Sequence, residues 1–507
     1  QLQNSLLATN NILTTLSTRW NILNYPNFLK SVAMPPSSWD TLRVKFQSKI
    51  LKGLLNIPNN QFVISWMGSS VTAGHDTPFN QSFSERTGRL MAPALEAVNI
   101  KVVSRNVALG NNPCIPYDLC VNAFAGTDAD IIHWEQSFNC DAGDNRKKDL
   151  FELFVRQSME LKSRPVVVFS NSYMPNWREE DCKDKKPVKI SDDEKKSIRF
   201  LQSNPKEIAT EVNKGAVREH WNVLVDVIDQ YRGAGIQVWN HGHYEEYKCH
   251  GPYIPDWGCC SAPWHPSILG HELRAAQFSY FWLLIFKDAI TTILSHSEQN
   301  LKGFQALVDK HIKAEVHYMP SAPIFDSPYN GVRCYTSFQP RSNNEFSLEN
   351  LVIPNKDGTK GFELSIFEMH TDPEIIKKAK SQGYHDFKYM LHGNKENGQL
   401  SLHIQVRKVG NSFLCQPPGN WGKLPEGFKN FWECDTELYL TENVENKDSF
   451  VFDSSHAKRL SYTQKNPKDS QTWLCVDIDD TLPIGQHVLT VVPTGEDQVS
   501  FAYLLLP

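Results

Sequence analysis

One short segment of the chain has the residue types of a nucleophile turn. Met67 to Gly74 reads Met-Gly-Ser-Ser-Val-Thr-Ala-Gly and follows Phe62–Met67, an apolar run typical of a buried strand. Open α/β sheets place their active sites in turns at the carboxyl ends of central strands. A serine there, at the amino end of the next helix, lies near backbone N–H groups that stabilise an oxyanion. Ser70 is therefore a candidate nucleophile; the structural alternative is a turn serine that caps a helix.

Three later segments place further candidate groups beside predicted strands and helices. Gly110 lies in a loop after one strand, with Ala108 as the neighbouring alternative, and Asn139 lies just past another. His265 lies in a turn before the last long helix. Taken singly, these positions also suit a turn glycine, a capping asparagine and a loop histidine without a catalytic role. His271 is expected to pack against or cap the final helix.

Ser, Gly, Asn and His in this order, over about residues 60 to 290, resemble the SGNH (GDSL-type) hydrolase family. The resemblance implies an α/β fold with a parallel sheet flanked by helices, and the activity of a serine esterase. It implies that Ser70 is the nucleophile and His265 its general base. It also implies an oxyanion hole made of the Ser70 N–H, the Gly110 N–H and the Asn139 side-chain amide. We expect neither a cofactor nor a metal.

Two positions depart from the family pattern. The family usually has Asp before the nucleophile, where this chain has Ser69, and its triad acid three residues before the histidine, where this chain has Ala262. The nearest upstream carboxylate is Asp256, nine positions before His265, and we expect it to orient the imidazole; the alternative is a main-chain carbonyl. The missing acids leave two other functions open: an O-acyltransferase that uses the same residues, and a catalytically silent structural or carbohydrate-binding protein.

A second polar cluster lies between the last predicted strand and His265. His-x-His on a strand puts both rings on one face, which is compatible with a metal site. No carboxylate spacing completes a known metal-binding pattern, so we expect a polar loop here. Aromatic residues crowd the same region and could stack on sugar rings. With the appended β domain, they favour an O-acylated carbohydrate as the substrate. The polar group is His241, His243, His250, Glu245, Glu246 and Asp256; the aromatic group is Trp239, Tyr244, Tyr247, Tyr253, Trp257 and Trp264.

Hydrophobic periodicity divides the chain into three parts. Residues 1–60 read as a helical N-terminal extension interrupted by prolines. Residues 61–300 alternate apolar strands with amphipathic helices, which predicts the α/β domain. Within it, long helices are expected over Pro205–Tyr231 and Glu272–Ser295. Residues 320–507 show strand alternation separated by turn residues, which predicts a β-sandwich.

Net charge and the length of the apolar runs argue against a nucleic-acid partner and against a transmembrane segment. Lys and Arg number 52 against 57 Asp and Glu, a net charge of −5, which lacks the basic footprint of a nucleic-acid binder. The longest apolar run, Phe278–Phe286, is far shorter than the roughly 18 to 20 residues that span a bilayer. We therefore expect no nucleic-acid partner and no transmembrane segment.

The eleven cysteines include no Cys-x-x-Cys pair, so a structural metal site is not expected. Their loop contexts indicate disulfides, of which we expect at least three, and an oxidising compartment. With one sequon at Asn80 and a chain that starts at Gln1, this favours a secreted or endomembrane-lumenal glycoprotein whose signal peptide has been removed.

Cys114–Cys120 is the expected short bridge. Cys334, Cys415, Cys434 and Cys475 could supply two bridges in the β domain, whose connectivity the sequence leaves open. The adjacent Cys259 and Cys260 are expected to form separate disulfides with distant partners, of which Cys249 is one candidate; a strained vicinal disulfide is the rarer alternative. The odd count leaves one thiol free or paired between chains.

Overall fold

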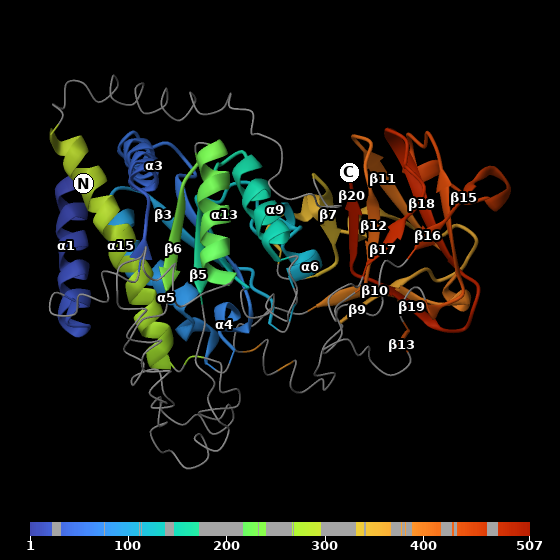
Figure 1. Ribbon diagram of the computed structural model, residues 1–507, viewed down its shortest axis with the longest axis horizontal. Helices are drawn as coiled ribbons and strands as arrows, with labels where there is room; N and C mark the ends of the chain where they lie inside the picture. The colour runs from blue at the N-terminus through green and yellow to red at the C-terminus, as the bar shows by residue number, and fades with distance from the viewer. Residues whose placement is uncertain are drawn as a thin grey trace, which may run out of the picture. The chain divides into compact units, whose positions relative to one another are not determined.

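The computed structural model divides into two compact units (Figure 1). Unit 1 comprises residues 1–110, 127–143 and 158–322, and unit 2 comprises residues 111–126, 144–157 and 323–507. The residues that the structure describes are 1–22, 32–75, 77–110, 112, 114–136, 147–171, 216–231, 233–239, 266, 268–295, 331–338, 341–366, 377, 381, 388–416, 428–429, 433–463 and 475–507.

Unit 1 contains a parallel sheet, as the strand–helix alternation predicted. Its five parallel strands lie in the order β3-β2-β4-β5-β6, and the short strand β1 joins the β6 edge antiparallel. Because β3 and β4 lie on opposite sides of β2, the direction of winding reverses at β2. The bounds are β1 Val32–Ala33, β2 Gln61–Gly68, β3 Lys101–Asn106, β4 Ile131–Glu135, β5 Val166–Asn171 and β6 Gly235–Trp239.

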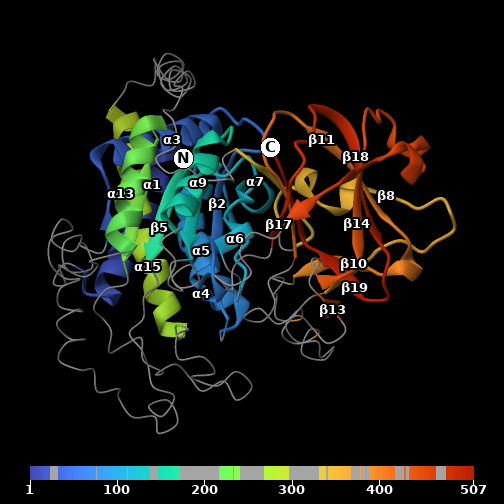
Figure 2. The same cartoon turned by 45° about the vertical axis from the view of Figure 1, so that its right-hand side comes forward.

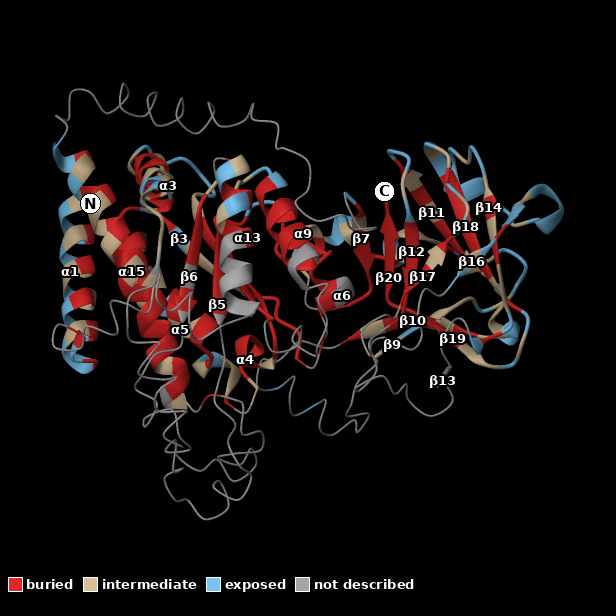
Figure 3. Ribbon diagram, in the orientation of Figure 1, coloured by how far each residue is buried: buried red, intermediate tan, exposed pale blue. Residues whose placement is uncertain are grey.

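Four helices cover one face of this sheet and share a core with it. Leu16, Phe46, Met91 and Phe286, one from each helix, are buried together with the strand residue Ile64. The N-terminal helices, predicted as an extension, therefore contribute to the core of the α/β unit, and α1 runs beside α15 (Figures 1 and 2). Only the outward side of α1 is exposed (Figure 3). The helices are α1 Leu2–Arg19, α3 Pro36–Leu54, α5 Phe83–Glu96 and α15 Ile268–Ser295.

Helix α13 (Ala216–Tyr231) covers the opposite face. Leu224 and Ile228 pack where a Cβ on Gly235 would lie, whereas the next strand residue, Ile236, enters the core of the first face. Of the predicted helix Pro205–Tyr231, residues 205–215 lie outside the described residues. Two short elements, α4 (Ser70–Ala73) and η2 (Phe79–Gln81), precede α5, and α9 (Lys147–Glu160) runs from unit 2 into unit 1.

Helix α15 is longer and more apolar overall than its uninterrupted apolar run suggested. Among the described residues, Gly270–Ser295 alone is long and apolar enough to cross a membrane, with a mean hydropathy of 1.2. In this structure α15 packs against α1, α3 and α5, and more than half of its most apolar stretch is buried. Its apolar side chains are those of a core helix.

Unit 2 is built from short strands in three sheets around one apolar core. The sequence predicted a β-sandwich, whereas the strands are divided among three sheets. Sequence alternation could not predict this division, because it marks each strand but not the strand with which it pairs. Leu402, Leu438 and Leu504, from three different strands, meet in the core. Strands β11, β18 and β14 lie side by side in Figure 2. The sheet orders are β13-β19-β10-β9, β15-β14-β18-β11-β8 and β16-β17-β12-β20-β7.

The strands of unit 2 are β7 Arg333–Thr336, β8 Val352–Ile353, β9 Glu363–Ile366, β10 Tyr389–Gly393, β11 Leu400–Val406, β12 Ser412–Cys415, β13 Phe428–Lys429, β14 Thr436–Thr441, β15 Lys458–Leu460, β16 Tyr462–Thr463, β17 Cys475–Ile478, β18 Gly485–Pro493, β19 Gln498–Phe501 and β20 Tyr503–Leu506. Its helices are α6 Cys114–Tyr117, α7 Val121–Phe124, and the 3-10 turns η5 Asn344–Phe346, η6 Glu349–Leu351, η7 Lys395–Asn397, η9 Lys447–Ser449 and η10 Ser454–His456.

Disulfides join distant parts of unit 2. Cys120 is bonded to Cys334, 214 residues away, with Cα atoms 5.0 Å apart, and Cys415 is bonded to Cys475 across β12 and β17. The predicted Cys114–Cys120 bridge is therefore wrong: Cys114 is disulfide-bonded, but not to Cys120. The two cysteines are close in sequence, yet packing of α7 against β7 brings Cys334 to Cys120 instead. Cys434 is a buried thiol, and Cys259 and Cys260 lie outside the described residues.

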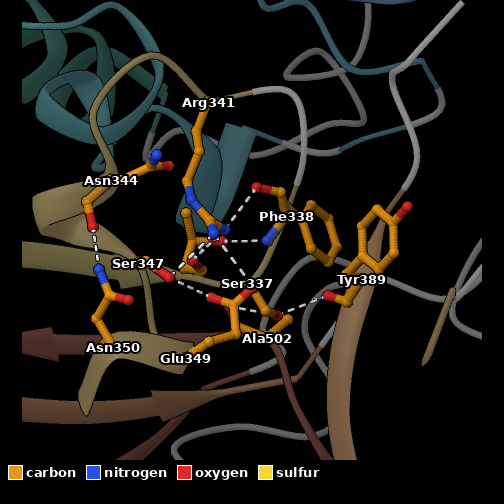
Figure 4. A network of polar contacts seen from close by, with 10 residues as sticks. Ser337, Phe338, Arg341, Asn344, Ser347, Glu349, Asn350, Tyr389 and Ala502 are labelled. Carbon is orange, nitrogen blue, oxygen red and sulfur yellow. Dashed lines mark hydrogen bonds and ion pairs between the residues drawn. The ribbon is translucent and has the colours of Figure 1, made fainter. Parts of the chain in front are cut away.

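A buried arginine fixes the segment that follows β7 (Figure 4). Arg341 donates to the Thr336 and Phe338 carbonyls through Nη1, at 2.9 and 3.2 Å. Through Nη2 it donates to Ser347 Oγ at 2.9 Å and pairs with Glu349 Oε1 at 3.2 Å. One side chain thus bonds two carbonyls at and just after the end of β7, and it ties η6 to them.

Candidate functional site

Ser70 lies in a tight strand–helix turn. Strand β2 ends at Gly68, Ser69 is the N-cap of α4, and Ser70 is the first helical residue. The Ser70 carbonyl accepts hydrogen bonds from the Gly74 and His75 N–H groups, both at 3.0 Å. Gly74 ends the helix with φ +85°, a conformation that glycine adopts without a Cβ penalty. Ser69 is buried whereas Ser70 is partly exposed, so the second serine is the one accessible from outside.

The strand order places this turn where such sheets bind ligands. The order β3-β2-β4-β5-β6 is the doubly wound order in which winding reverses between the first and third strands, here β2 and β4. Ligands bind in the crevice outside the carboxyl ends of the strands at that point. Ser70 lies two residues after the end of β2, and the last residue of β4, Glu135, pairs in register with Gly68. The segment 68–74 therefore lies, as the sequence predicted, in a turn at the carboxyl end of a central strand.

The buried Glu135 carboxylate holds the turn from the neighbouring strand. Its Oε2 accepts hydrogen bonds from Ser69 Oγ at 2.6 Å, Thr72 Oγ1 at 2.9 Å and the Ser69 N–H at 3.3 Å. The Glu135 carbonyl accepts a further bond from the same N–H at 2.8 Å. Position 69, where the resembling family has Asp, thus carries a serine whose hydroxyl is bonded to a carboxylate from β4.

Gly68 makes this close approach possible. A Cβ at position 68 would overlap the Thr72 side chain and come within 3.2 Å of the Glu135 carbonyl oxygen. Any larger residue would push α4 away from β4. The glycine before the two serines is therefore required by the packing of the turn.

The loop after β3 is hydrogen-bonded to the end of β2. Val107 N–H donates to the Trp66 carbonyl and Leu109 N–H to the Gly68 carbonyl, both at 3.0 Å. Asn106 Nδ2 donates to the Thr72 carbonyl at 3.0 Å, and Asn106 Oδ1 accepts from the Ala108 N–H at 3.2 Å. These bonds bring Gly110 to the same end of the sheet as the Ser70 turn.

A histidine that the sequence analysis did not single out lies against Gly110. A Cβ on Gly110 would overlap His75 Cε1 and come within 2.9 Å of both ring nitrogens. His75 is only partly exposed, and its N–H is bonded to the Ser70 carbonyl. The imidazole of His75 thus lies against Gly110, while the His75 backbone is bonded to Ser70, the other candidate oxyanion-hole residue that the structure describes.

A neutral histidine lies in the layer beneath the turn. His133 on β4 is fully buried among Trp66, Phe83 and Phe278, and its Nδ1 is 3.1 Å from the Met67 carbonyl oxygen. Burial, with the nearby Arg274 charge as a smaller cause, lowers the pKa of His133 from 6.5 to about 3. His133 is therefore uncharged at neutral pH, with Nδ1 as the donor to Met67.

Helix α15 begins beside α5. His271 in its first turn is buried, and its Nδ1 accepts a hydrogen bond from the Phe83 N–H at 3.2 Å. The two rings are stacked with centroids 5.7 Å apart. The residue before Phe83, Ser82, lies where a Cβ on Gly74 would overlap it. The predicted packing role of His271 is confirmed.

The remaining predicted site residues, Asn139, His265 and Asp256, lie outside the described residues, as does the polar and aromatic cluster of 241–264. Ser70 and Gly110 are the two that the structure brings to one end of the sheet. The sequence analysis missed Glu135, although a carboxylate in a strand that is otherwise apolar and aromatic is a signal, since such groups are rarely buried without partners. In the part of the chain that is described, no group of three or more His, Cys, Asp or Glu residues could hold a metal.

Solved structures similar to this chain include the following two. Both are of a two-domain esterase (CEX) active on acetylated mannans, and one is co-crystallized with mannopentaose. The mannopentaose structure is 13% identical, has a TM-score of 0.41, and covers 94% of this chain and 97% of its own. The second is also 13% identical, with a TM-score of 0.38 and coverages of 90% and 95%. No family model and no curated protein matches this chain.

Proposed function

We propose that this protein is a serine ester hydrolase whose nucleophile is Ser70. The observation that carries the proposal is the position of Ser70: a partly exposed serine in a carboxylate-anchored turn at the carboxyl end of β2, where the winding of the sheet reverses. A structural capping role is filled by the preceding residue, because Ser69 Oγ accepts the Val71 N–H. Ser70 is therefore not needed as the helix cap.

In the proposed reaction, Ser70 Oγ attacks the ester carbonyl carbon while His265 accepts the hydroxyl proton. The Ser70 and Gly110 N–H groups and the Asn139 amide stabilise the tetrahedral oxyanion. The C–O bond to the alcohol then breaks, and His265 returns the proton to the departing oxygen. Water, deprotonated by the same imidazole, attacks the acyl-enzyme, which releases the carboxylic acid and restores Ser70.

The start of α15 supports the role of His265. His271 anchors the first turn of α15 to Phe83, and Ser82 contacts Gly74 at the end of the nucleophile helix. His265 precedes Ile268, the first residue of α15, by three positions, which an extended chain spans in about 10 Å. The imidazole is therefore expected within reach of the turn that carries Ser70.

The experiment is active-site labelling with a fluorophosphonate probe, together with hydrolysis of p-nitrophenyl acetate. The full chain should be labelled at Ser70, as located by peptide mass spectrometry, and Ser70→Ala should lose both labelling and turnover. Ser461→Ala, which changes an exposed serine of unit 2, should retain both. Labelling that persists in Ser70→Ala, or an unmodified chain without labelling or turnover, would contradict the proposal.

As the substrate class we propose O-acyl groups on a carbohydrate, because aromatic residues that could stack on sugar rings precede His265 in the sequence. Acetate release from O-acetylated oligosaccharides should exceed release from a simple alkyl acetate, measured as kcat/KM. Equal values for the two substrates would remove carbohydrate from the proposal but leave the hydrolase. Acyl transfer to an added sugar acceptor, at the expense of free acetate, would identify a transferase.

A further inference from the structure

We propose that Glu135 is a positioning residue for the nucleophile: its buried carboxylate fixes the orientation of Ser70 through Ser69 and Thr72. The inference rests on the proposed function. It assigns Glu135 an indirect role, because Glu135 acts on Ser70 through Ser69 and Thr72 and does not itself touch the substrate. It is carried by the three hydrogen bonds that converge on Glu135 Oε2, all from residues of the Ser70 turn.

These hydrogen bonds hold residues that precede and follow Ser70 in the chain. Ser69 is held by its N–H and its hydroxyl, and Thr72, two residues after Ser70, is held by its hydroxyl. The Ser70 carbonyl is fixed in turn by the Gly74 and His75 N–H groups. With residues 69 and 72 attached to one carboxylate, the backbone of Ser70 is restrained on both sides. The direction of the Ser70 hydroxyl then depends only on which staggered χ1 rotamer it adopts.

The energetics of burial favour this role over a purely structural one. A buried carboxylate loses several kcal/mol of solvation, and well-packed apolar residues often replace buried charges without loss of stability. The contrast with Asp130 is informative, because that carboxylate lies just before β4 at its other end. Asp130 pairs with Lys49 at 2.9 Å and accepts the Val63 N–H at 2.9 Å, which links two strands and a helix. The three hydrogen bonds to Glu135 Oε2, in contrast, all come from residues of the Ser70 turn.

Accurate placement of a nucleophile matters more to the chemical step than to substrate binding. A displacement of about 1 Å at a reacting group can cost about 100-fold in rate. Glu135→Gln keeps the size of the side chain but replaces charge-assisted hydrogen bonds with neutral ones of about half the strength. The expected result is a loss of about 10- to 100-fold in kcat on p-nitrophenyl acetate, with KM changed by less than about twofold.

The experiment compares Glu135→Gln, Thr72→Val, their double variant and the control Asp130→Asn in the full chain. Asp130→Asn should lower Tm but keep kcat, because it alters a buried carboxylate away from the turn. Thr72→Val removes one donor with little change of shape, so it keeps the test open if Glu135→Gln does not fold. If both residues act on one turn, kcat of the double variant should equal that of the more impaired single variant, within about twofold.

Three outcomes would overturn the inference. Glu135→Gln with wild-type kcat and a lowered Tm would make the carboxylate structural while the proposed function stands. Multiplicative losses in the double variant would mean that Glu135 and Thr72 act separately. An unmodified chain that neither hydrolyses ester nor labels at Ser70 would remove the proposed function and, with it, the role of Glu135. Fluorophosphonate labelling rates distinguish the first two from the third, because Ser70 remains reactive in both.

Discussion

The imidazole of His75 occupies the space in which a side chain on Gly110 would lie. The chain thus brings a histidine from just beyond α4 onto a glycine from the loop after β3. The His75 N–H is at the same time bonded to the Ser70 carbonyl. This contact links the two parts of the proposed oxyanion hole, and it makes the absence of a side chain at position 110 a packing requirement.

Gly110→Ala should therefore impair catalysis. The new Cβ would overlap His75 and force either the imidazole or the loop to move, so we expect a fall of about 100-fold in kcat/KM, measured with p-nitrophenyl acetate. The double variant Gly110→Ala/His75→Ala should recover part of the loss because the overlap is gone. Gly495→Ala is the control, since its Cβ would meet Asp435 Cβ at an ordinary 3.5 Å. Unchanged activity in Gly110→Ala would argue against Gly110 as an oxyanion donor.

The identity of the group that orients His265 is testable by substitution. If Asp256 is the triad acid, Asp256→Asn should lower kcat by up to about 10⁴-fold, the loss known for the equivalent change in a serine protease and used here as a guide. Tm should stay nearly unchanged. If a main-chain carbonyl orients the imidazole, Asp256→Asn should be nearly silent while His265→Ala still inactivates. Activity retained in His265→Ala would exclude His265 as the base.

Folding stability should depend on pH through His133. In the unfolded chain this imidazole takes up a proton below about pH 6.5, whereas burial lowers its pKa in the folded protein to about 3. The unfolded state therefore binds more protons between these values, and stability falls as pH falls through this window, by at most about 1.4 kcal/mol per pH unit. Stability contributed by the neutral imidazole is fully present above the unfolded pKa.

Urea unfolding of the wild type and of His133→Phe, from about pH 7.5 to about pH 5, isolates this contribution. The variant keeps an aromatic ring among Trp66, Phe83 and Phe278 but has no titrating group. It should be less stable at neutral pH, because the Met67 carbonyl loses its donor, and its stability should decline less steeply with acidification. Parallel declines in both proteins would show that His133 is not buried in the neutral form.

Removal of the Cys120–Cys334 bridge should destabilise unit 2. The bridge closes a loop of 214 residues, and the loss of such a disulfide costs about 2–4 kcal/mol of unfolding free energy. Cys120→Ser/Cys334→Ser should show this loss in urea unfolding followed by a probe in unit 2. A non-reduced peptide map of the unmodified chain should show Cys120 linked to Cys334 and Cys415 linked to Cys475. A Cys114–Cys120 peptide would contradict the observed pairing.

Local sequence patterns were sufficient to predict the elements of unit 1 that precede and follow Gly68 and the turn between them. The apolar run before Gly68 and the glycines and serines after it specify a strand that ends in a tight turn, because each signal lies within a few residues of the others. The strand alternation of Leu400–Val406 and the apolar face of α15 were likewise readable, since burial repeats with the period of the element itself.

Only the tertiary structure decided which elements meet. Glu135 is 66 residues from Ser69 and on a strand separated from β2 in sequence by β3, so its bond to the Ser69 hydroxyl follows from the strand order β3-β2-β4. The contact of His75 with Gly110 and the bond between Cys120 and Cys334 have the same origin. Periodicity specifies which face of an element is buried, but its partner is selected by the packing of the whole core, where contributions from distant segments compete.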